Sequence, residues 1–252
     1  MNDQATISVV IPHHRNFSAL ALSVQSVVSQ SLQPLEVIIV NDDNEHLNSN
    51  QLDQLLVRSD CIRVFETGLC RGGSAQPRNI AIDLSRGRYV AFLDADDIWL
   101  PNHLENLEQL WDLSPDVIIH GHQFCWGEGL DRPFFKAGLS TRDTPQSTLR
   151  QLLRFGKTIF LSSVGAPTEL LKRYKFDSDF LWEDFDLWLR LAADGHSFVN
   201  SNSYTTLYQI RKGSRSGRRE ARKEASQQII GKYFDGWPLF LLPPWLLRNL
   251  YF

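Results

Sequence analysis

YVAFLDADD, residues 89–97, decides the fold of this chain, because an apolar run leads directly into three aspartates. The run at 89–93 has the length of a strand, and its continuous apolar character is typical of a strand buried on both faces. Such strands occur in parallel sheets covered by helices. The aspartates are then expected at the carboxyl end of the strand, where the loops of these sheets diverge and ligands bind.

Three strand–helix units precede this stretch. Apolar runs predict strands at 7–12, 36–40 and 62–65, and apolar residues at helical spacing predict helices at 17–28, 47–57 and 74–84. This alternation predicts an α/β fold with a mostly parallel central sheet and helices on both faces. The second strand also ends in a polar cluster, so we expect Asp42 to share one crevice with the aspartates at 94–97.

The pattern is less regular after Trp99, where we predict a helix at 102–112, a strand near 117–120 and a loop at 127–145. No second domain is required by the length of 252 residues or by the 42% hydrophobic content. We expect one domain at 1–210, with halves at about 1–100 and 101–210, followed by a basic and aromatic extension at 211–252.

The net charge of -3 does not indicate a nucleic-acid partner, although seven basic residues cluster between positions 211 and 223. The three cysteines have no CxxC spacing, which favours a reducing, cytoplasmic location over a disulfide framework or a zinc site. The N-terminal residues lack the basic start of a signal peptide, and no apolar run approaches the roughly 20 residues that span a bilayer. We therefore expect a soluble or peripheral protein.

Residues 237–252, WPLFLLPPWLLRNLYF, are rich in leucine and aromatic side chains. Following the basic stretch, they have the composition of a segment that rests on an anionic membrane surface. The alternative is that they pack on the domain or form a dimer contact. The sequence leaves both open.

Asp94, Asp96 and Asp97 are close enough to repel one another unless a cation joins them, and their hard oxygen ligands suit Mg²⁺ or Mn²⁺. The alternative is that Asp96 or Asp97 caps a helix that begins near Trp99. Asp42 is likewise either a turn residue or a hydrogen-bond acceptor for a nucleobase or ribose.

The segment WEDFDLWLRLAAD, residues 182–194, predicts a helix whose first turn contains Glu183 and Asp184. The helix N-terminus favours the ionised form of a carboxylate. Asp184 is therefore either a general base for a hydroxyl group or an acid that only stabilises the helix.

Taken together, four blocks resemble the ordered landmarks of family 2 glycosyltransferases, which have the Rossmann-like GT-A fold. The blocks are ISVVIP (7–12), VIIVNDDN (37–44), PRNIAIDLSRGRYVAFLDADDIWLP (77–101) and WEDFDLWLRLAADG (182–195). The resemblance covers residues 7 to about 210, and its specificity lies in the order and spacing of the blocks.

The resemblance implies an inverting transfer of sugar from a nucleoside-diphosphate sugar, UDP-linked, to a hydroxyl of a glycan, lipid-linked or protein acceptor. It implies that Asp94 and Asp96 form a DxD pair around Ala95 and hold Mn²⁺ or Mg²⁺, with Asp96 as the direct ligand. Asp184 corresponds to the inverting base. The residues implied to contact the base and ribose of the donor are Pro12, His13 and Asp42, and Arg78 is implied to lie near this donor site.

Two segments depart from the family pattern. His13, His14 and Arg15 stand where many relatives have Thr-Tyr-Asn. In LYQIRKGS, residues 207–214, Arg211 replaces a histidine that serves the metal in relatives, and its guanidinium suits direct pairing with a diphosphate.

Three other classes of protein compete with this interpretation. A nucleotidyltransferase needs a glycine-rich phosphate loop after the first strand, and a dehydrogenase needs GxGxxG there; HHRN at 13–16 has neither. A non-catalytic nucleotide-sugar or glycan-binding module of the same fold is opposed by Asp94, Asp96 and Asp184, while Arg211 keeps it open.

Overall fold

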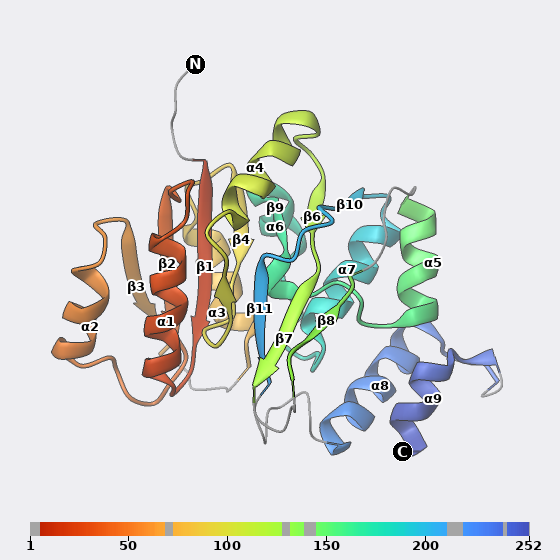
Figure 1. Cartoon of the computed structure of the whole chain (residues 1–252). Helices are drawn as coiled ribbons and strands as arrows, with labels where there is room; N and C mark the ends of the chain where they lie inside the picture. The colour runs from red at the N-terminus through yellow and green to blue at the C-terminus, as the bar shows by residue number, and fades with distance from the viewer. Residues whose placement is uncertain are drawn as a thin grey trace.

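The computed structural model describes residues 6–68, 73–127, 132–138, 145–210, 219–238 and 241–251, which fold around a seven-stranded sheet (Figure 1). The strand order is β10-β6-β9-β4-β1-β2-β3. Neighbouring strands pair in parallel except at β9, which is antiparallel to both β4 and β6. The strands are β1 (Ile7–His13), β2 (Glu36–Asn41), β3 (Ile62–Glu66), β4 (Tyr89–Phe92), β6 (Ile118–His120), β9 (Gly165–Pro167) and β10 (Phe198–Asn200). The mostly parallel α/β sheet expected from the sequence is confirmed.

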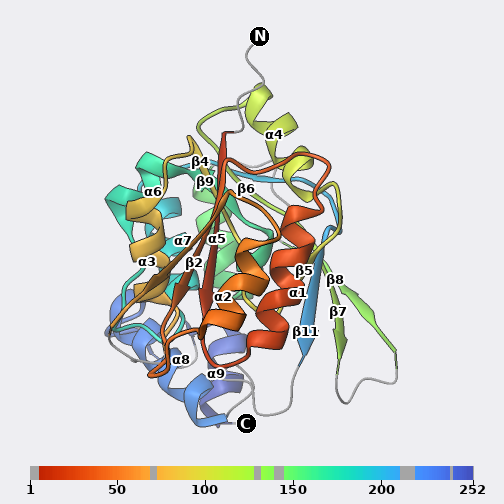
Figure 2. The same cartoon turned by 90° about the vertical axis from the view of Figure 1, so that its left-hand side faces the viewer.

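Alternate residues of the central strands enter two separate cores, one on each face of the sheet, because successive side chains of a strand point to opposite faces. In β1, Val10 joins one core, whereas Val9 and Ile11 join the other. Helices cover both faces (Figure 2). The core of Val9 includes residues of α1 (Phe17–Val28), α2 (Ser49–Leu56) and α4 (His103–Leu113). The core of Val10 includes residues of α3 (Ala75–Leu84), α6 (Thr168–Tyr174) and α7 (Glu183–Ala193).

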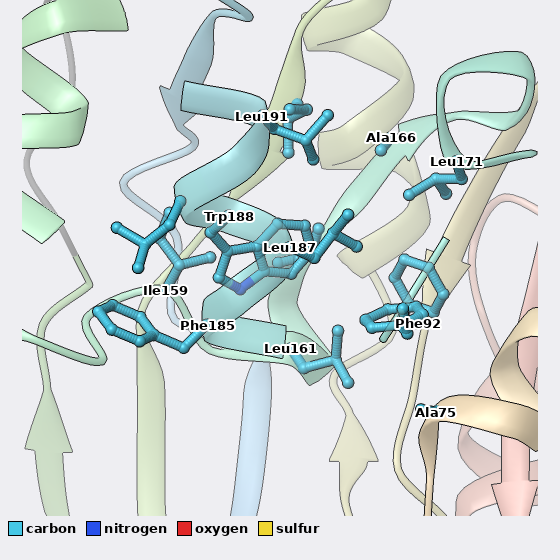
Figure 3. Close-up of a cluster of buried hydrophobic side chains, with 14 of the residues drawn as sticks. Ala75, Phe92, Ile159, Leu161, Ala166, Leu171, Phe185, Leu187, Trp188 and Leu191 are labelled. Atoms are coloured by element: carbon cyan, nitrogen blue, oxygen red, sulfur yellow. The ribbon is translucent and has the colours of Figure 1, made fainter. Parts of the chain in front are cut away.

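The larger core is centred on α7. Figure 3 shows the indole of Trp188 among Phe185, Leu187 and Leu191, with Phe92 of β4 on the opposite side of the cluster. Trp188 and Phe185 are each 1% exposed. The apolar face predicted for this helix is therefore confirmed, and it fixes the first turn of α7 against the sheet.

A second, four-stranded sheet lies beside the first, with the order β5-β11-β7-β8 (Figure 1). Its strands are β5 (Ile98–Trp99), β11 (Thr206–Ile210), β7 (Gln123–Gly127) and β8 (Phe134–Lys136). The predicted loop at 127–145 is wrong in part, because β8 lies within it and pairs with β7. The apolar residues Phe134 and Phe135 stay exposed on this edge strand, so burial gave no pattern from which to predict it.

The described part of the C-terminal segment forms α8 (Arg219–Tyr233) and α9 (Pro244–Tyr251) and packs on the domain. In this packing, α9 contacts α5 (Pro145–Phe155). Leu242 and Leu246 are buried in the core of α7, and the Trp245 indole donates a hydrogen bond of 3.0 Å to the Leu153 carbonyl. Among the described apolar residues of this segment, Trp237 and Leu241 remain exposed. A membrane contact through this segment therefore has no support here. Within the described ranges, no helix has the length and apolar character needed to cross a membrane.

Candidate active site

A cavity of about 580 Å³ opens at the carboxyl ends of β1 and β4, between the main sheet, the second sheet and the start of α7. Six of the site residues predicted from the sequence line this one cavity. They are Pro12, Arg78, Asp94, Ala95, Asp96 and Asp184. The structure thus brings the aspartates that follow β4 together with the aspartate of α7, although they are about ninety positions apart in the sequence.

Ser162 holds the loop that carries the three aspartates. Its hydroxyl accepts the backbone N–H of Asp94 at 3.1 Å and donates to Oδ2 of Asp97 at 2.6 Å. Asp97 is 1% exposed and also accepts the N–H of Gln209 from β11. Burial, together with the charges of Asp94 and Asp96, raises the pKa of the Asp97 carboxyl well above its ordinary value. Asp97 therefore faces the protein, and Asp94 and Asp96 are left to face the cavity.

The helix-capping alternative for Asp96 and Asp97 is wrong. The helix after this loop, α4, begins only at His103, and Trp99 belongs to β5 instead. The N-cap position of α4 is Asn102.

Arg78 connects the two acidic parts of the site. Its guanidinium donates from Nη2 to Asp94 at 2.6 Å and from Nη1 to Glu183 at 2.7 Å. Burial opposes the charge of Arg78, but the carboxylates of Asp94 and Glu183 outweigh it and raise the pKa of the guanidinium. Arg78 therefore stays charged and fixes Asp94 relative to the first turn of α7. The resemblance implies that Arg78 lies near the donor, and the structure places it in the cavity lining, in contact with carboxylates.

Asp184 lies in the first turn of α7, as predicted. One of its carboxylate oxygens accepts the N–H of Phe185 at 2.8 Å and lies 2.9 Å from Nζ of Lys157. The carboxylate therefore lies at the N-terminal end of α7 and forms an ion pair with Lys157. Asp184 thus forms a hydrogen bond within the first turn, as expected of an acid that stabilises the helix. It also lines the cavity, as expected of a general base.

His13 and Asp42 are placed differently from Asp184. Neither is among the described residues that line the cavity. The Asp42 carboxylate accepts the Thr67 hydroxyl at 2.6 Å and is 2% exposed. Burial lowers the pKa of His13 to about 4, so the ring is neutral near pH 7. His14, which was not predicted, lines the cavity instead.

The residues that face the cavity fit a divalent cation shared with a phosphate ligand. No group of three or more His, Cys, Asp or Glu side chains among the described residues is arranged to hold a metal. Asp94 and Asp96 together offer carboxylate oxygens from one loop. Mg²⁺ is commonly held in proteins by one or two carboxylates, with the remaining positions filled by water and substrate phosphates. The pair suits that mode of binding.

Several lining residues escaped the sequence analysis. Lys136, Lys157 and Ser162 come from elements that had not been predicted or from loops without a motif, whereas Trp182 begins the segment at 182–195 but had not been assigned to the site. A lone lysine or serine in such a segment gives no signal until the fold places it. Arg211, which we expected near the diphosphate, lies outside the described residues.

Comparison with known proteins decides the family. The sequence profile described as glycosyl transferase family 2 matches residues 8–169, which is more than half of the chain. The chain belongs to glycosyl transferase family 2. The nucleotidyltransferase and dehydrogenase alternatives are thereby set aside. The family match includes β1 to β9, and therefore Asp94 and Asp96, but it ends before Asp184.

This family 2 member is 23% identical over 212 residues to the Escherichia coli UDP-Glc:alpha-D-GlcNAc-diphosphoundecaprenol beta-1,3-glucosyltransferase WfaP. The match covers 82% of this chain and 78% of WfaP. A second Escherichia coli relative, WfgD, has the same enzyme description as WfaP. It is 23% identical to this chain, over 92% of this chain and 88% of WfgD.

Solved structures show the same GT-A fold. The crystal structure of S. aureus TarS residues 1–349 in complex with UDP-GlcNAc superposes with a TM-score of 0.68 at 18% identity. The match covers 89% of this chain but 66% of the TarS chain, so the chain spans slightly less than two thirds of that protein. The mannosyltransferase PcManGT from Pyrobaculum calidifontis, in complex with GDP-Man and Mn²⁺, has a TM-score of 0.68 at 16% identity, over 98% and 70% of the two chains.

Proposed function

We propose that this chain is an inverting glycosyltransferase that moves a sugar from a nucleoside-diphosphate sugar to an acceptor hydroxyl, with Asp184 as the base. One observation carries the proposal: Asp184 lines the same cavity as Asp94 and Asp96. A base and a cation site that line one cavity suit a single displacement, in which attack and departure occur on opposite faces of the sugar.

In the proposed reaction, the Asp184 carboxylate accepts the proton of the acceptor hydroxyl as its oxygen bonds to the anomeric carbon. The bond between that carbon and the diphosphate oxygen breaks, and the nucleoside diphosphate leaves with the electron pair. Asp184 lies in the first turn of α7, in contact with the ammonium of Lys157. Inversion at the anomeric carbon follows because the acceptor and the leaving group lie on opposite faces.

Asp94 and Asp96 are the residues that would hold Mn²⁺ or Mg²⁺, and Arg78 keeps Asp94 in place. When bound, the cation stabilises the negative charge that develops on the leaving diphosphate. The presence of Mn²⁺ in the PcManGT complex supports this assignment. So does the arrangement of Ser162, which turns Asp97 inward and leaves Asp94 and Asp96 at the cavity.

For the donor we propose a UDP-linked sugar, as in the name of WfaP and in the TarS complex with UDP-GlcNAc. For the acceptor we propose a glycan or a lipid-linked glycan, the class that the name of WfaP states. We assign the catalytic domain to residues 1–210, with the donor half at about 1–100 and the acceptor half at about 101–210. We place the reaction in the cytoplasm, a reducing compartment compatible with the free thiols of Cys61 and Cys125.

The test is an assay of donor consumption and transfer with a panel of nucleotide sugars, a panel of glycan acceptors and Mn²⁺. The anomeric configuration of the product is read by proton NMR. We expect turnover of a UDP-sugar and a product of inverted configuration. A product of retained configuration removes the inverting mechanism. Tight binding of nucleotide sugars without any donor consumption or transfer favours the non-catalytic binding module instead.

A further inference from the structure

Two lysines that the proposed reaction does not require for donor binding lie on one side of the cavity. Lys136 belongs to β8 and pairs across the second sheet with Gln123 of β7, and both residues line the cavity. Lys157 follows α5 and also lines it. These residues lie on the acceptor half of the chain, apart from the β1 and β4 ends that carry Pro12 and Asp94.

The contacts of the two lysines differ. Nζ of Lys157 lies 2.9 Å from Asp184 and 5.5 Å from the Trp182 ring centre. Nζ of Lys136 lies 4.7 Å from the ring centre of Phe160, and within the described ranges no carboxylate forms an ion pair with it. Lys136 therefore places an ammonium at the cavity, in contact with the aromatic face of Phe160.

The energetic position of Lys136 is unfavourable without a further partner. Burial lowers the pKa of its ammonium; Cys125 opposes this shift, and the positive charge of Lys157 adds a smaller lowering effect. Like charges that face one cavity repel, and the repulsion is relieved when an anion lies between them. Asp184 forms an ion pair with Lys157, and no described carboxylate forms one with Lys136.

We propose that Lys136 and Lys157 form a second anion subsite, which binds a phosphate group of the acceptor next to the base Asp184. This inference rests on the proposed function and specifies its substrate class: an acceptor glycan that carries a phosphate or diphosphate. The donor diphosphate is assigned to different residues, Asp94 and Asp96, which line the same cavity.

Binding at this subsite has a consequence for the base. Lys157 is in contact with Asp184 before the acceptor arrives. A phosphate that accepts hydrogen bonds from Lys157 shares this cation and loosens the ion pair. The Asp184 carboxylate is then available to the acceptor hydroxyl when a phosphorylated acceptor is in place.

The first experiment measures binding by titration calorimetry, with saturating UDP and Mn²⁺ present so that the donor site is filled. Glucose 1-phosphate is compared with glucose, and phosphatidylglycerol vesicles are compared with phosphatidylcholine vesicles. The sugar phosphate tests a soluble phosphate source, and the vesicles test a lipid source. We expect glucose 1-phosphate or the anionic vesicles to bind at least about tenfold more tightly than the neutral partner, a difference of about 1.4 kcal/mol. Equal binding within both pairs overturns the proposal.

Three variants locate the site. Lys136→Gln removes the charge and is expected to abolish the preference for the phosphorylated ligand, whereas Lys136→Arg keeps the charge and is expected to retain it. Lys172→Gln is the matched control, because Lys172 lies outside the cavity and pairs with Glu169 on the surface. An unchanged preference in Lys136→Gln, or an equal loss in Lys172→Gln, contradicts the assignment.

The failure of this inference can be told apart from the failure of the proposed function. The wild-type chain is assayed for transfer to phosphorylated and to neutral glycans under the same conditions. Transfer with no preference for the phosphorylated glycan overturns the phosphate subsite and leaves the transferase intact. The absence of donor consumption with every nucleotide sugar overturns the proposed function itself.

Discussion

Nη2 of Arg78 lies 2.6 Å from Oδ1 of Asp94, and this contact connects α3 to the end of β4. The same guanidinium reaches Glu183, the residue before Asp184, at 2.7 Å. A single buried cation thus sets the distance between the aspartates assigned to the metal and the aspartate assigned as base.

Arg78→Ala is expected to reduce both stability and donor binding, because it leaves two carboxylates without their shared cation. The loss of one partner of a buried ion pair costs about 3–5 kcal/mol, which thermal or urea unfolding would detect. Arg63→Ala serves as the control, since Arg63 pairs with buried Glu36 and neither residue lines the cavity. If Arg78→Ala binds UDP with Mn²⁺ as well as Arg63→Ala does, Arg78 does not organise the site.

The stabilising effect of UDP is expected to depend on a divalent cation through Asp96. A ligand at 100 times its Kd stabilises the native state by about 2.7 kcal/mol, so the melting temperature should rise with UDP and Mn²⁺ together. EDTA or Asp96→Asn should remove most of that rise. Asp112→Asn, an exposed residue of α4, should retain it. A rise that survives both EDTA and Asp96→Asn would count against the cation.

Trp245 of α9 is expected to support the active site from the C-terminal segment. Its indole packs 5.5 Å from Phe185 and 6.1 Å from Trp182 by ring centres, on either side of Asp184 in the sequence. It also lies over Gly156, where an added Cβ would meet the ring at 2.9 Å, and Gly156 precedes Lys157.

Trp245→Ala should therefore lower the stability by about 3 kcal/mol, the cost of truncating a packed tryptophan. It should lower kcat as well, because Phe185, next to Asp184, and Gly156, next to Lys157, both lose their packing against the indole. Trp245→Phe should recover much of each loss. Trp237→Ala is the control in the same segment, since Trp237 is 54% exposed. Equal effects of Trp237→Ala and Trp245→Ala in unfolding and steady-state assays would show that α9 has no special role.

The free energy of unfolding is expected to decrease as the pH is lowered, in part because of His103. Burial lowers the pKa of His103 from 6.5 to about 3, so the unfolded chain binds the proton first as the pH falls. The native state loses stability as the pH falls below about 6.5, by roughly 3 kcal/mol at pH 4 from this residue. Urea unfolding at pH 7, 5.5 and 4 would measure it. His103→Gln should show a shallower fall, and an identical pH dependence would exclude His103 as a cause.

The first half of the fold could be predicted from the sequence because its strands are buried on both faces. Ile38 and Val40 enter one core while Val37 and Ile39 enter the other, so every position must be apolar and the run is conspicuous. The second sheet has no such pattern. In β11, the residues after Thr206 are only partly buried, and β8 is exposed throughout, so neither strand alternates clearly.

The acidic residues of the site could be predicted because they follow a strand or begin a helix, as Asp94 and Asp184 do. The basic residues could not. Lys157 is brought to Asp184 only by the packing of α5 against α7, and Lys136 reaches the cavity only through the pairing of β8 with β7. The orientation of Asp97 was also hidden, because it depends on Ser162, sixty-five positions away.

The most direct test of the account is transfer by Asp184→Asn, measured with donor binding on the same preparation. Asparagine keeps the size of the side chain and an oxygen for the Phe185 N–H, but it cannot accept the proton of the acceptor hydroxyl. We expect transfer to fall by at least about a hundredfold, the range of general base catalysis, while UDP binding with Mn²⁺ changes little. Transfer by Asp184→Asn at close to the wild-type rate would contradict the assignment of Asp184 as the base.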